Sequence, residues 1–394
     1  MEECRPILNT GLRGFTVATT RISHVDKMAD KLIYRGYLVR ELAKNSSFEE
    51  VAFLLLYEKL PGRTEIKTFR EQLSAAREIP PDLISAIKTR PKNSLPMDIL
   101  QASTAMLAND DPDVQHQSYS KENSLKMGIR LIAKFPTIVA AWDRIRSGRE
   151  PVNPSSELGH AANFLYMMTG EKPDKKIARF LDICLILHAE HSFNASTFSA
   201  RQVASTRAHI YAAAAAAVGS LSGELHGGAN SRVMEMLKKI GSADAVQSYI
   251  DKELAAGRVI FGLGHAVYKG DDPRAAILET MSKALGKKTG KPKWYQISKL
   301  LEKNGKETFK HHKGRDIFVN VDFWSASVYH YMGIPMDLFT PAFAVARIAG
   351  WVAHILEEQF AGAAPEPVLY RPDSEYVGDY CGREECPYTP LPER

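Results

Sequence analysis

Apolar residues recur along most of the chain at intervals of three and four positions, the spacing of one face of an α-helix. Ile66, Phe69 and Leu73 follow this spacing after a polar stretch. Ser47 and Glu50 form a capping-box pattern at the start of another apolar run. We expect further helices over 97–108, 122–146, 157–168, 174–189, 200–222, 231–240, 243–256, 273–286, 294–304, 323–332 and 341–360.

Strand signals are few by comparison. The segments 13–23 and 32–39 are the best candidates, and they predict a small N-terminal β-hairpin. Strands and helices do not alternate regularly, which excludes a doubly wound parallel sheet. Pro136 lies inside the long helical stretch 122–146, where it should kink or split the helix because it lacks an N–H group. The pattern therefore predicts a large, compact and mainly α-helical protein.

Composition fits this expectation and narrows the class of ligand. The 394 residues, 44% of them hydrophobic, suffice for one large domain and a smaller one. The formal net charge of +5 is only mildly basic, and no block of Lys and Arg resembles a nucleic-acid-binding arm. A modest positive surplus suits a small polyanionic ligand better than nucleic acid.

The sequence contains no strong signal for a targeting peptide, a membrane span or a cysteine pair. The N-terminal sequence MEECRPILNTG has no apolar core, so we expect neither a secretory signal nor a transit peptide. The longest apolar run, 211–223, is alanine-rich and too short to cross a bilayer. Cys381 and Cys386 lie close together, but without CxxC spacing or a nearby histidine, which favours free thiols over a disulfide or a metal pair. We therefore expect a cytoplasmic protein that does not enter a membrane.

Three histidines lie in unusual local settings. His191 belongs to LHAEHSFNAST, His226 to ELHGGANS, and His265 to FGLGHAVYKGDDPR. Glycines flank two of them, and glycine allows the backbone to approach a ligand closely. Each histidine taken alone also fits a surface or core position, and HGGAN also fits a helix C-cap with a turn. The wide separation of the histidines, without HExxH or cysteine partners, argues against a zinc site.

Charged residues also occur where apolar neighbours make them costly. Arg347 lies inside AFAVARIAGWVAHIL, where an arginine is unfavourable unless it meets an anion. Arg274 lies at a helix start and Arg371 in LYRPDSEY, and guanidinium groups bind carboxylates in a bidentate way. Asp322 lies among Val, Phe and Trp, where desolvation would raise the pKa of its carboxyl, as suits a general base. A helix N-cap is the alternative interpretation of Asp322.

The segment GLGHAVYKGDDPR, residues 262–274, resembles the signature of the citrate synthase family. Leu263 departs from the residue that is usual at its position. The segments HGGAN, HAEH…NAST, NVDFWSA and GIPMDLFTPAFAVAR are also similar to family segments and occur in the family order. The resemblance covers nearly the whole chain, and several motifs in register are more specific than any one of them.

This resemblance implies an all-α fold with a large helical domain, a smaller helical domain and a cleft between them. The large domain would comprise 1–227 and 334–394, and the small domain 228–333. Members of the family condense an acyl-coenzyme A, here most simply acetyl-CoA, with oxaloacetate. The acyl-CoA is a co-substrate, and the resemblance implies no metal ion and no other cofactor.

The resemblance also assigns roles to individual residues. Asp322 matches the base that removes a proton from the acyl carbon, and His226 matches the residue that hydrogen-bonds to the thioester oxygen. His265 matches the group that polarises and protonates the ketone of oxaloacetate. The expected oxaloacetate ligands are His191, Arg274, Arg347 and, from the other subunit of a homodimer, Arg371. The expected coenzyme A contacts are Leu263, Gly264, Lys269, Lys313 and Arg315.

Other functions remain open at this point. A 2-methylcitrate synthase would use propionyl-CoA with the same catalytic residues, and the one methylene that distinguishes the donors is worth only about 1–3 kcal/mol in a hydrophobic pocket. A non-catalytic relative that binds the ligand is a second alternative, and a helical interaction scaffold is a third. His226, His265 and Asp322 argue against the non-catalytic relative, because binding oxaloacetate needs no desolvated carboxylate base, and a scaffold predicts no such site at all.

Overall fold

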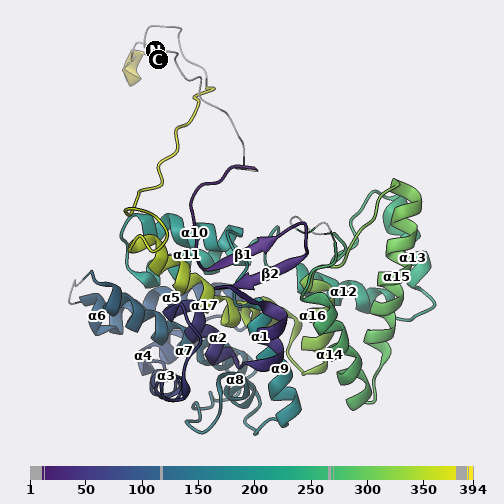
Figure 1. Ribbon diagram of the computed structural model, residues 1–394, viewed down its shortest axis with the longest axis horizontal. Helices are drawn as coiled ribbons and strands as arrows, with labels where there is room; N and C mark the ends of the chain where they lie inside the picture. Colours follow the sequence, from purple (N-terminus) through teal and green to yellow (C-terminus); the bar gives the residue numbers. More distant parts are fainter. Residues whose placement is uncertain are drawn as a thin grey trace.

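Helices make up most of the protein. The computed structural model describes residues 11–12, 14–115, 119–264, 268, 270–378, 388 and 390–393. Figure 1 shows many helices and one small sheet near the N-terminal end of the described chain. The predicted all-α class with a minor N-terminal β-hairpin is therefore confirmed.

The sheet is antiparallel and adds one short strand to the expected hairpin. Its strands, in spatial order, are β1 (Ser23–Asp26), β2 (Lys31–Tyr34) and β3 (Tyr37–Leu38). The first strand thus begins where the predicted segment 13–23 ends, so that part of the expectation is wrong. Asp26 Oδ1 accepts the backbone N–H groups of Met28 and Ala29 at 3.0 and 2.9 Å, which closes the turn into β2.

One group of helices is centred on α17 (Phe339–Gln359), whose residues are all buried; some of its members pack on α17 directly and the others pack on those helices. The stretch Met336–Gln359 is long and apolar enough to cross a bilayer, but the fold buries all of α17 within it, as is typical of a core helix. The other helices of this group are α1 (Val39–Asn45), α2 (Phe48–Tyr57), α3 (Arg63–Ala75), α4 (Pro81–Lys88), α5 (Pro96–Met106), α6 (Pro112–Gln115), α7 (Lys121–Arg146), α8 (His160–Thr169), α9 (Lys175–His188), α10 (Ala195–Ser205) and α11 (Ile210–Ser222).

A second group of helices lies to one side of the first (Figure 1). Its members pack mainly on one another. They are α12 (Ala229–Ile240), α13 (Val246–Ala255), α14 (Ala275–Lys288), α15 (Lys293–Lys313) and α16 (Val321–Tyr331). Short 3-10 turns occur at Leu107–Asp110, Met336–Leu338 and Leu391–Glu393.

One expectation about the helices is wrong, a second is excluded in one of its two forms, and a third is confirmed in detail. Pro136 was expected to kink or split its helix, and the split does not occur: α7 continues through Pro136, because buried packing on both sides offsets one lost hydrogen bond. The stretch 200–222 is two helices, separated at Arg207, which has a positive φ of +63°. The capping box at α2 is present: Ser47 Oγ accepts the N–H of Glu50 at 3.4 Å, and Glu50 Oε2 accepts that of Ser47 at 2.8 Å.

The chain beyond α17 leaves the helical body. Figure 1 shows the segment 371–378 extending away from the helices. Thr19 Oγ1 donates to the carbonyl oxygen of Ala363, so the N-terminal segment begins beside this C-terminal arm. Tyr376 is 70% exposed and Val377 is 87% exposed, an unusual setting for apolar side chains.

Candidate active site

Asp322 lies at the N-terminus of α16, but it is not the residue that caps the helix. Asn320 Oδ1 accepts the backbone N–H groups of Asp322 and Phe323 at 3.0 and 3.3 Å, which makes Asn320 the N-cap. The N-cap interpretation of Asp322 is therefore wrong. Its carboxyl group takes no part in the cap and remains available for chemistry.

The surroundings of Asp322 change the acidity of its carboxyl group. Burial raises the pKa to about 6, against the opposing influence of Arg274, while Asp272 reinforces the rise and Arg347 opposes it. The carboxyl is thus ionised at neutral pH but remains a stronger base than an ordinary aspartate. A pKa near 6 is typical of a general base that works at neutral pH.

A short pairing fixes the loop before His265 to the start of α16. The N–H of Gly264 donates to Phe318 O at 2.7 Å, and the N–H of Asn320 donates to Gly262 O at 3.0 Å. Asn320 Nδ2 also donates to Gly264 O at 3.0 Å. The predicted coenzyme A loop is thereby held beside the predicted base. His265 and Lys269 themselves lie outside the described residues.

Gly262 has a conformation and a packing that only glycine tolerates. Its φ is +82°, and a Cβ there would lie 2.8 Å from Cβ of Phe323. We expect Gly262→Ala to lower the free energy of unfolding by about 2–4 kcal/mol, through backbone strain and overpacking together. Gly264 provides the matched control: its φ is +97°, but the nearest atom to its Cβ position is 3.8 Å away. Gly264→Ala should cost only about 1–2 kcal/mol in urea denaturation, and equal losses in both variants would contradict the steric argument.

Hydrogen bonds determine the tautomer of His226. Ser196 donates its backbone N–H to His226 Nε2 at 3.2 Å, and Ser196 Oγ lies 2.8 Å from the same nitrogen. A backbone N–H can only donate, so Nε2 must accept and the proton of the neutral ring resides on Nδ1. Burial, with Arg347 nearby, lowers the pKa of His226 to about 4. The ring is thus neutral at pH 7 and offers Nδ1–H as a donor.

Arg274 and Arg347 converge on the C-terminal end of α9. Both are 2% exposed. Arg347 Nε donates to His188 O at 2.6 Å, and Arg274 Nη1 donates to Leu187 O at 3.4 Å. These carbonyls belong to the last helical turn, where orphan acceptors and the helix dipole favour cations. Burial lowers the pKa of Arg347 to about 10, so the guanidinium stays charged at neutral pH.

Arg274 already has a carboxylate partner within the chain. Its Nε and Nη2 donate to Asp272 Oδ1 and Oδ2 at 2.9 and 2.7 Å, a bidentate pair. Burial alone would raise the pKa of the Asp272 carboxyl, but Arg274 outweighs it and lowers the pKa far below the usual range. The pair holds the Arg274 side chain rigid beside Asp322.

His191 belongs to the loop that follows α9. Its Nε2 lies 3.1 Å from the hydroxyl of Tyr268, and the two rings meet edge to face with centroids 5.6 Å apart. The structure therefore brings four of the predicted residues toward one place, around the start of α16 and the end of α9. They are His191, Arg274, Asp322 and Arg347, and His226 also lies near Arg347, whose charge helps to lower the pKa of this histidine.

The remaining predicted residues occupy other positions. The side chain of Leu263 packs against α15, since a Cβ at Gly305 would lie 2.6 Å from its Cδ1. Lys313 and Arg315 are exposed at the C-terminal end of α15, and the Arg315 guanidinium lies 5.6 Å from the ring centre of Phe309. Arg371 is exposed on the arm that leaves the body.

Comparison with known proteins identifies the family. Residues 11–373 match the family described as citrate synthase, C-terminal domain. The chain belongs to the citrate synthase family. It is 44% identical to the citrate synthase of Synechocystis sp., over 98% of this chain and 94% of that protein. It is 35% identical to the 2-methylcitrate synthase of Shewanella oneidensis, over 96% of this chain and 97% of that protein.

A solved structure of a citrate synthase has the same fold as this protein. It is the ternary complex of citrate synthase from Thermoplasma acidophilum with carboxymethyl coenzyme A and oxaloacetate. The TM-score is 0.89 at 28% identity, over 98% of this chain and 100% of that chain. The protein is therefore an acyltransferase of the citrate synthase type, as the sequence predicted.

Sequence reasoning missed several residues that shape the site of this citrate synthase-family enzyme. Asn320 carries an N-cap signal two positions before Asp322, and that signal could have found it. Ser196 and Tyr268 give no comparable signal, because their contacts with His226 and His191 join residues that are 30 and 77 positions apart.

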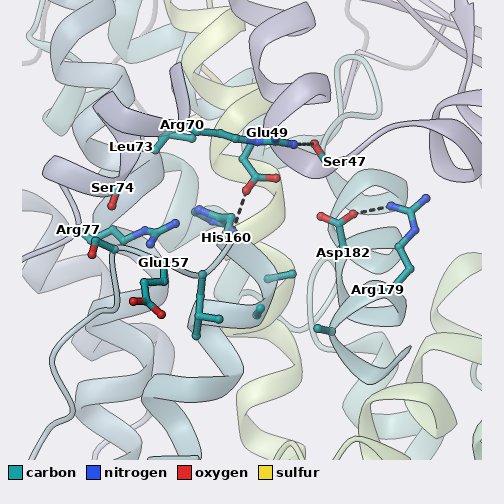
Figure 2. A pocket seen from close by; sticks show the side chains of 16 residues that line it. Ser47, Glu49, Arg70, Leu73, Ser74, Arg77, Glu157, His160, Arg179 and Asp182 are labelled. Carbon is teal, nitrogen blue, oxygen red and sulfur yellow. Dashed lines mark hydrogen bonds and ion pairs between the residues drawn. The ribbon is translucent and has the colours of Figure 1, made fainter. Parts of the chain in front are cut away.

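A separate cavity of about 460 Å³ lies between α2, α3, α8 and α9 (Figure 2). Arg77 and His160 point toward one another there, and Glu49 Oε1 accepts the backbone N–H of His160 at 2.8 Å. Burial lowers the pKa of His160 to about 3, so its ring is neutral. The lining of this cavity includes none of the predicted site residues that the structure describes. It is thus distinct from the site around Asp322.

Proposed function

We propose that the protein condenses acetyl-CoA with oxaloacetate and water to give citrate and free coenzyme A, at the site around Asp322. One observation carries the proposal: the carboxylate of Asp322, whose pKa is raised, lies near the buried Arg274 and Arg347, and the neutral His226 also lies near Arg347. The Thermoplasma relative holds oxaloacetate and carboxymethyl coenzyme A, which supports the two substrate classes.

The chemistry follows from the protonation states. The ionised Asp322 accepts a proton from the methyl carbon of the thioester, and Nδ1–H of His226 donates to the thioester oxygen as negative charge develops there. The nucleophilic carbon then attacks the ketone carbon of oxaloacetate, and the ketone oxygen takes a proton from His265. Water cleaves the resulting thioester at its carbonyl carbon, and the departing thiolate takes a proton.

The two carboxylates of oxaloacetate require several cations. We assign them to Arg274 and Arg347, with His191 as a further ligand and Arg371 supplied by the partner subunit. Arg274 and Arg347 are held rigidly before substrate arrives, which lowers the entropy cost of binding. We assign coenzyme A to the loop with Leu263 and Gly264 and to the basic residues Lys269, Lys313 and Arg315. No metal ion or further cofactor enters this proposal.

We assign residues 228–333 to a small domain and 1–227 with 334–394 to a large one. The packing of α12 to α16 mainly on one another supports this division. Asp322 and Arg274 would then come from the small domain, and Arg347 and His191 from the large one. Closing such a cleft would exclude water until the carbon–carbon bond has formed.

We further assign a homodimer with shared active sites. Leu95, which precedes α5, is 64% exposed, Met106 at the end of α5 is 37% exposed, and Val377 on the arm is 87% exposed. We assign these exposed apolar side chains to surface that a second copy covers. The buried free thiol of Cys184 fits the reducing cytoplasm, where we place the protein.

The donor preference can be measured directly. We expect thiol release from acetyl-CoA that depends on oxaloacetate, with a kcat/KM higher than for propionyl-CoA. A higher kcat/KM for propionyl-CoA would instead identify a 2-methylcitrate synthase, the activity named for the Shewanella relative. A folded sample that binds oxaloacetate but releases no thiol from either donor would refute the proposal.

A further inference from the structure

Buried polar side chains form a hydrogen-bonded network that begins beside His191. Glu190 and His354 are 0% exposed, and Arg201 is 3% exposed. His354 Nε2 lies 3.0 Å from Glu190 Oε1, and His354 Nδ1 lies 3.0 Å from Arg201 Nη1. Arg201 Nη1 also donates to Glu357 Oε2 at 2.7 Å. One histidine of α17 therefore bridges a carboxylate and a guanidinium in the interior.

The partners of His354 determine its tautomer. A guanidinium can only donate, so Nδ1, which faces Arg201, must accept. The proton of the ring then resides on Nε2, which donates to Glu190.

Glu190 fixes the backbone around His191. Its Oε1 accepts the hydroxyl of Ser23 at 2.8 Å and also the backbone N–H of Ser192. Ser192 has a φ of +52°, a region that residues with a side chain rarely adopt. Such a conformation persists only where neighbouring groups enforce it. The Glu190 carboxylate is one of these groups, and it acts on the residue directly after His191.

Glu190 also lies near Arg347, another residue that we assign to oxaloacetate. Burial alone would raise the pKa of Glu190, but the hydrogen bond from His354 and the positive charge of Arg347 outweigh it and lower the pKa, so the carboxylate is ionised. A Cβ at Gly350 would lie 2.4 Å from Glu190 Oε2, which shows how closely α17 approaches this carboxylate. The negative charge of Glu190 thus lies against the helix that carries Arg347.

The end of this polar network that is farthest from His191 reaches the C-terminal arm. Arg201 Nη2 pairs with Glu358 Oε2 at 2.6 Å, and the hydroxyl of Tyr370 donates to the same oxygen at 2.9 Å. The N–H of Tyr370 also donates to Ser205 Oγ at 3.3 Å. Tyr370 directly precedes Arg371, so this anchor lies at the base of the segment that carries Arg371.

We propose that His354 is a positioning residue for the oxaloacetate site. It orients Glu190, whose carboxylate holds the loop of His191 and balances the positive charge of Arg347. Arg201, Glu358 and Tyr370 extend the same support to the arm. Hydrogen bonds are stronger in the low-dielectric interior than in water, so the bonds of this buried network favour a single arrangement of its side chains. The inference rests on the proposed function, because it concerns residues assigned there to oxaloacetate.

The test compares two replacements of His354. His354→Leu removes both hydrogen bonds, whereas His354→Gln retains a donor that can reach Glu190. We expect His354→Leu to raise the KM for oxaloacetate about tenfold or more, as for the loss of one hydrogen bond to a charged group, with a smaller change in kcat. His354→Gln should restore most of the affinity, and the KM for acyl-CoA should stay unchanged in both.

His160→Gln is the matched control for burial. His160 is a histidine with 1% exposure in the separate cavity of Figure 2, so its replacement should affect the melting temperature but not the KM for oxaloacetate. Tyr370→Phe is a second test that does not perturb the core, because it removes only the hydroxyl, which contacts Glu358 and Arg201. It should raise the KM for oxaloacetate by a smaller factor, about twofold to fivefold.

Two results would overturn the proposal. One is an unchanged KM for oxaloacetate in folded His354→Leu, or in Tyr370→Phe if His354→Leu does not fold. The other is an equal loss of affinity in His354→Leu and His354→Gln. Calorimetric titration with oxaloacetate separates this inference from the proposed activity, because it needs no turnover. A wild-type protein that binds oxaloacetate without releasing thiol would refute the activity and leave the His354 comparison valid.

Discussion

Asp322→Asn is expected to lower kcat for oxaloacetate-dependent thiol release by about 10²–10⁴-fold, the range that a positioned general base contributes. The amide has nearly the same shape but cannot accept the proton of the acyl carbon. Helix α16 should keep its start, because Asn320 caps the backbone N–H of residue 322 and not its carboxyl. The assay is steady-state thiol release with saturating oxaloacetate.

Binding distinguishes a chemical effect from a structural one. Oxaloacetate should still raise the melting temperature of Asp322→Asn, since the cationic ligands that we propose for it, Arg274 and Arg347, are intact. Asp244→Asn is the control, because Asp244 is an exposed carboxylate in the same group of helices. Turnover that survives in Asp322→Asn would exclude the carboxylate from the mechanism. Loss of the oxaloacetate-induced shift would mean that the substitution disrupts the site itself.

The raised pKa of Asp322 adds a signature in the pH dependence. The base must be ionised, so kcat/KM should fall as the pH decreases through about 6. The free energy of unfolding changes with pH in the opposite direction to kcat/KM. It falls as the pH rises, because the folded protein binds this proton more tightly than the unfolded chain does. The stabilisation from the protonated carboxyl is complete below pH 3.8 and is lost as the pH rises through about 6. Asp322→Asn should therefore be more stable than wild type at pH 7, by up to about 2 kcal/mol, but not at pH 4.

The sequence predicted the fold well wherever local periodicity decides the structure. The helical spacing of Ile66, Phe69 and Leu73 and the cap at Ser47 are local signals, and α3 and α2 form there. The break between α10 and α11 was not predictable, because Arg207 is no usual helix breaker and the apolar pattern continues across it. The continuity of α7 through Pro136 depends on the helices that bury it, which no local pattern reveals.

The candidate site also has features that local sequence predicts and features that only tertiary contacts determine. Asp322, His226 and Arg347 stood out because each is a polar residue in an apolar or glycine-rich setting. The charge state of each depends on tertiary neighbours. The accepting Nε2 of His226 follows from Ser196, and the rigidity of the His191 loop follows from Glu190. Such contacts join distant segments, so only the folded chain reveals them.

Arg371→Leu is expected to lower kcat/KM by about 10²–10³-fold, the cost of losing a bidentate contact with a substrate carboxylate. The residue lies on the exposed arm of its own chain, so we assign its action to the partner's site. Asp322→Asn and Arg371→Leu should then complement each other. In a mixed dimer, the Arg371→Leu subunit keeps its Asp322 and receives Arg371 from the other subunit, which rebuilds one site of two.

Mixing provides the measurement and its own control. Equal amounts of the two variants, unfolded and refolded together, should recover about a quarter of wild-type activity, because half of the dimers are mixed and each has one complete site. The matched pair is Asp322→Asn with Arg347→Leu. Both of these residues belong to the same subunit's site, so every site in that mixture lacks one of them and no activity should return. Equal failure of the two mixtures would place Arg371 in its own subunit's site or outside the site altogether. Recovery in the first mixture alone requires a site built by two chains, and it would also explain why the arm with Arg371 extends away from the body that carries it.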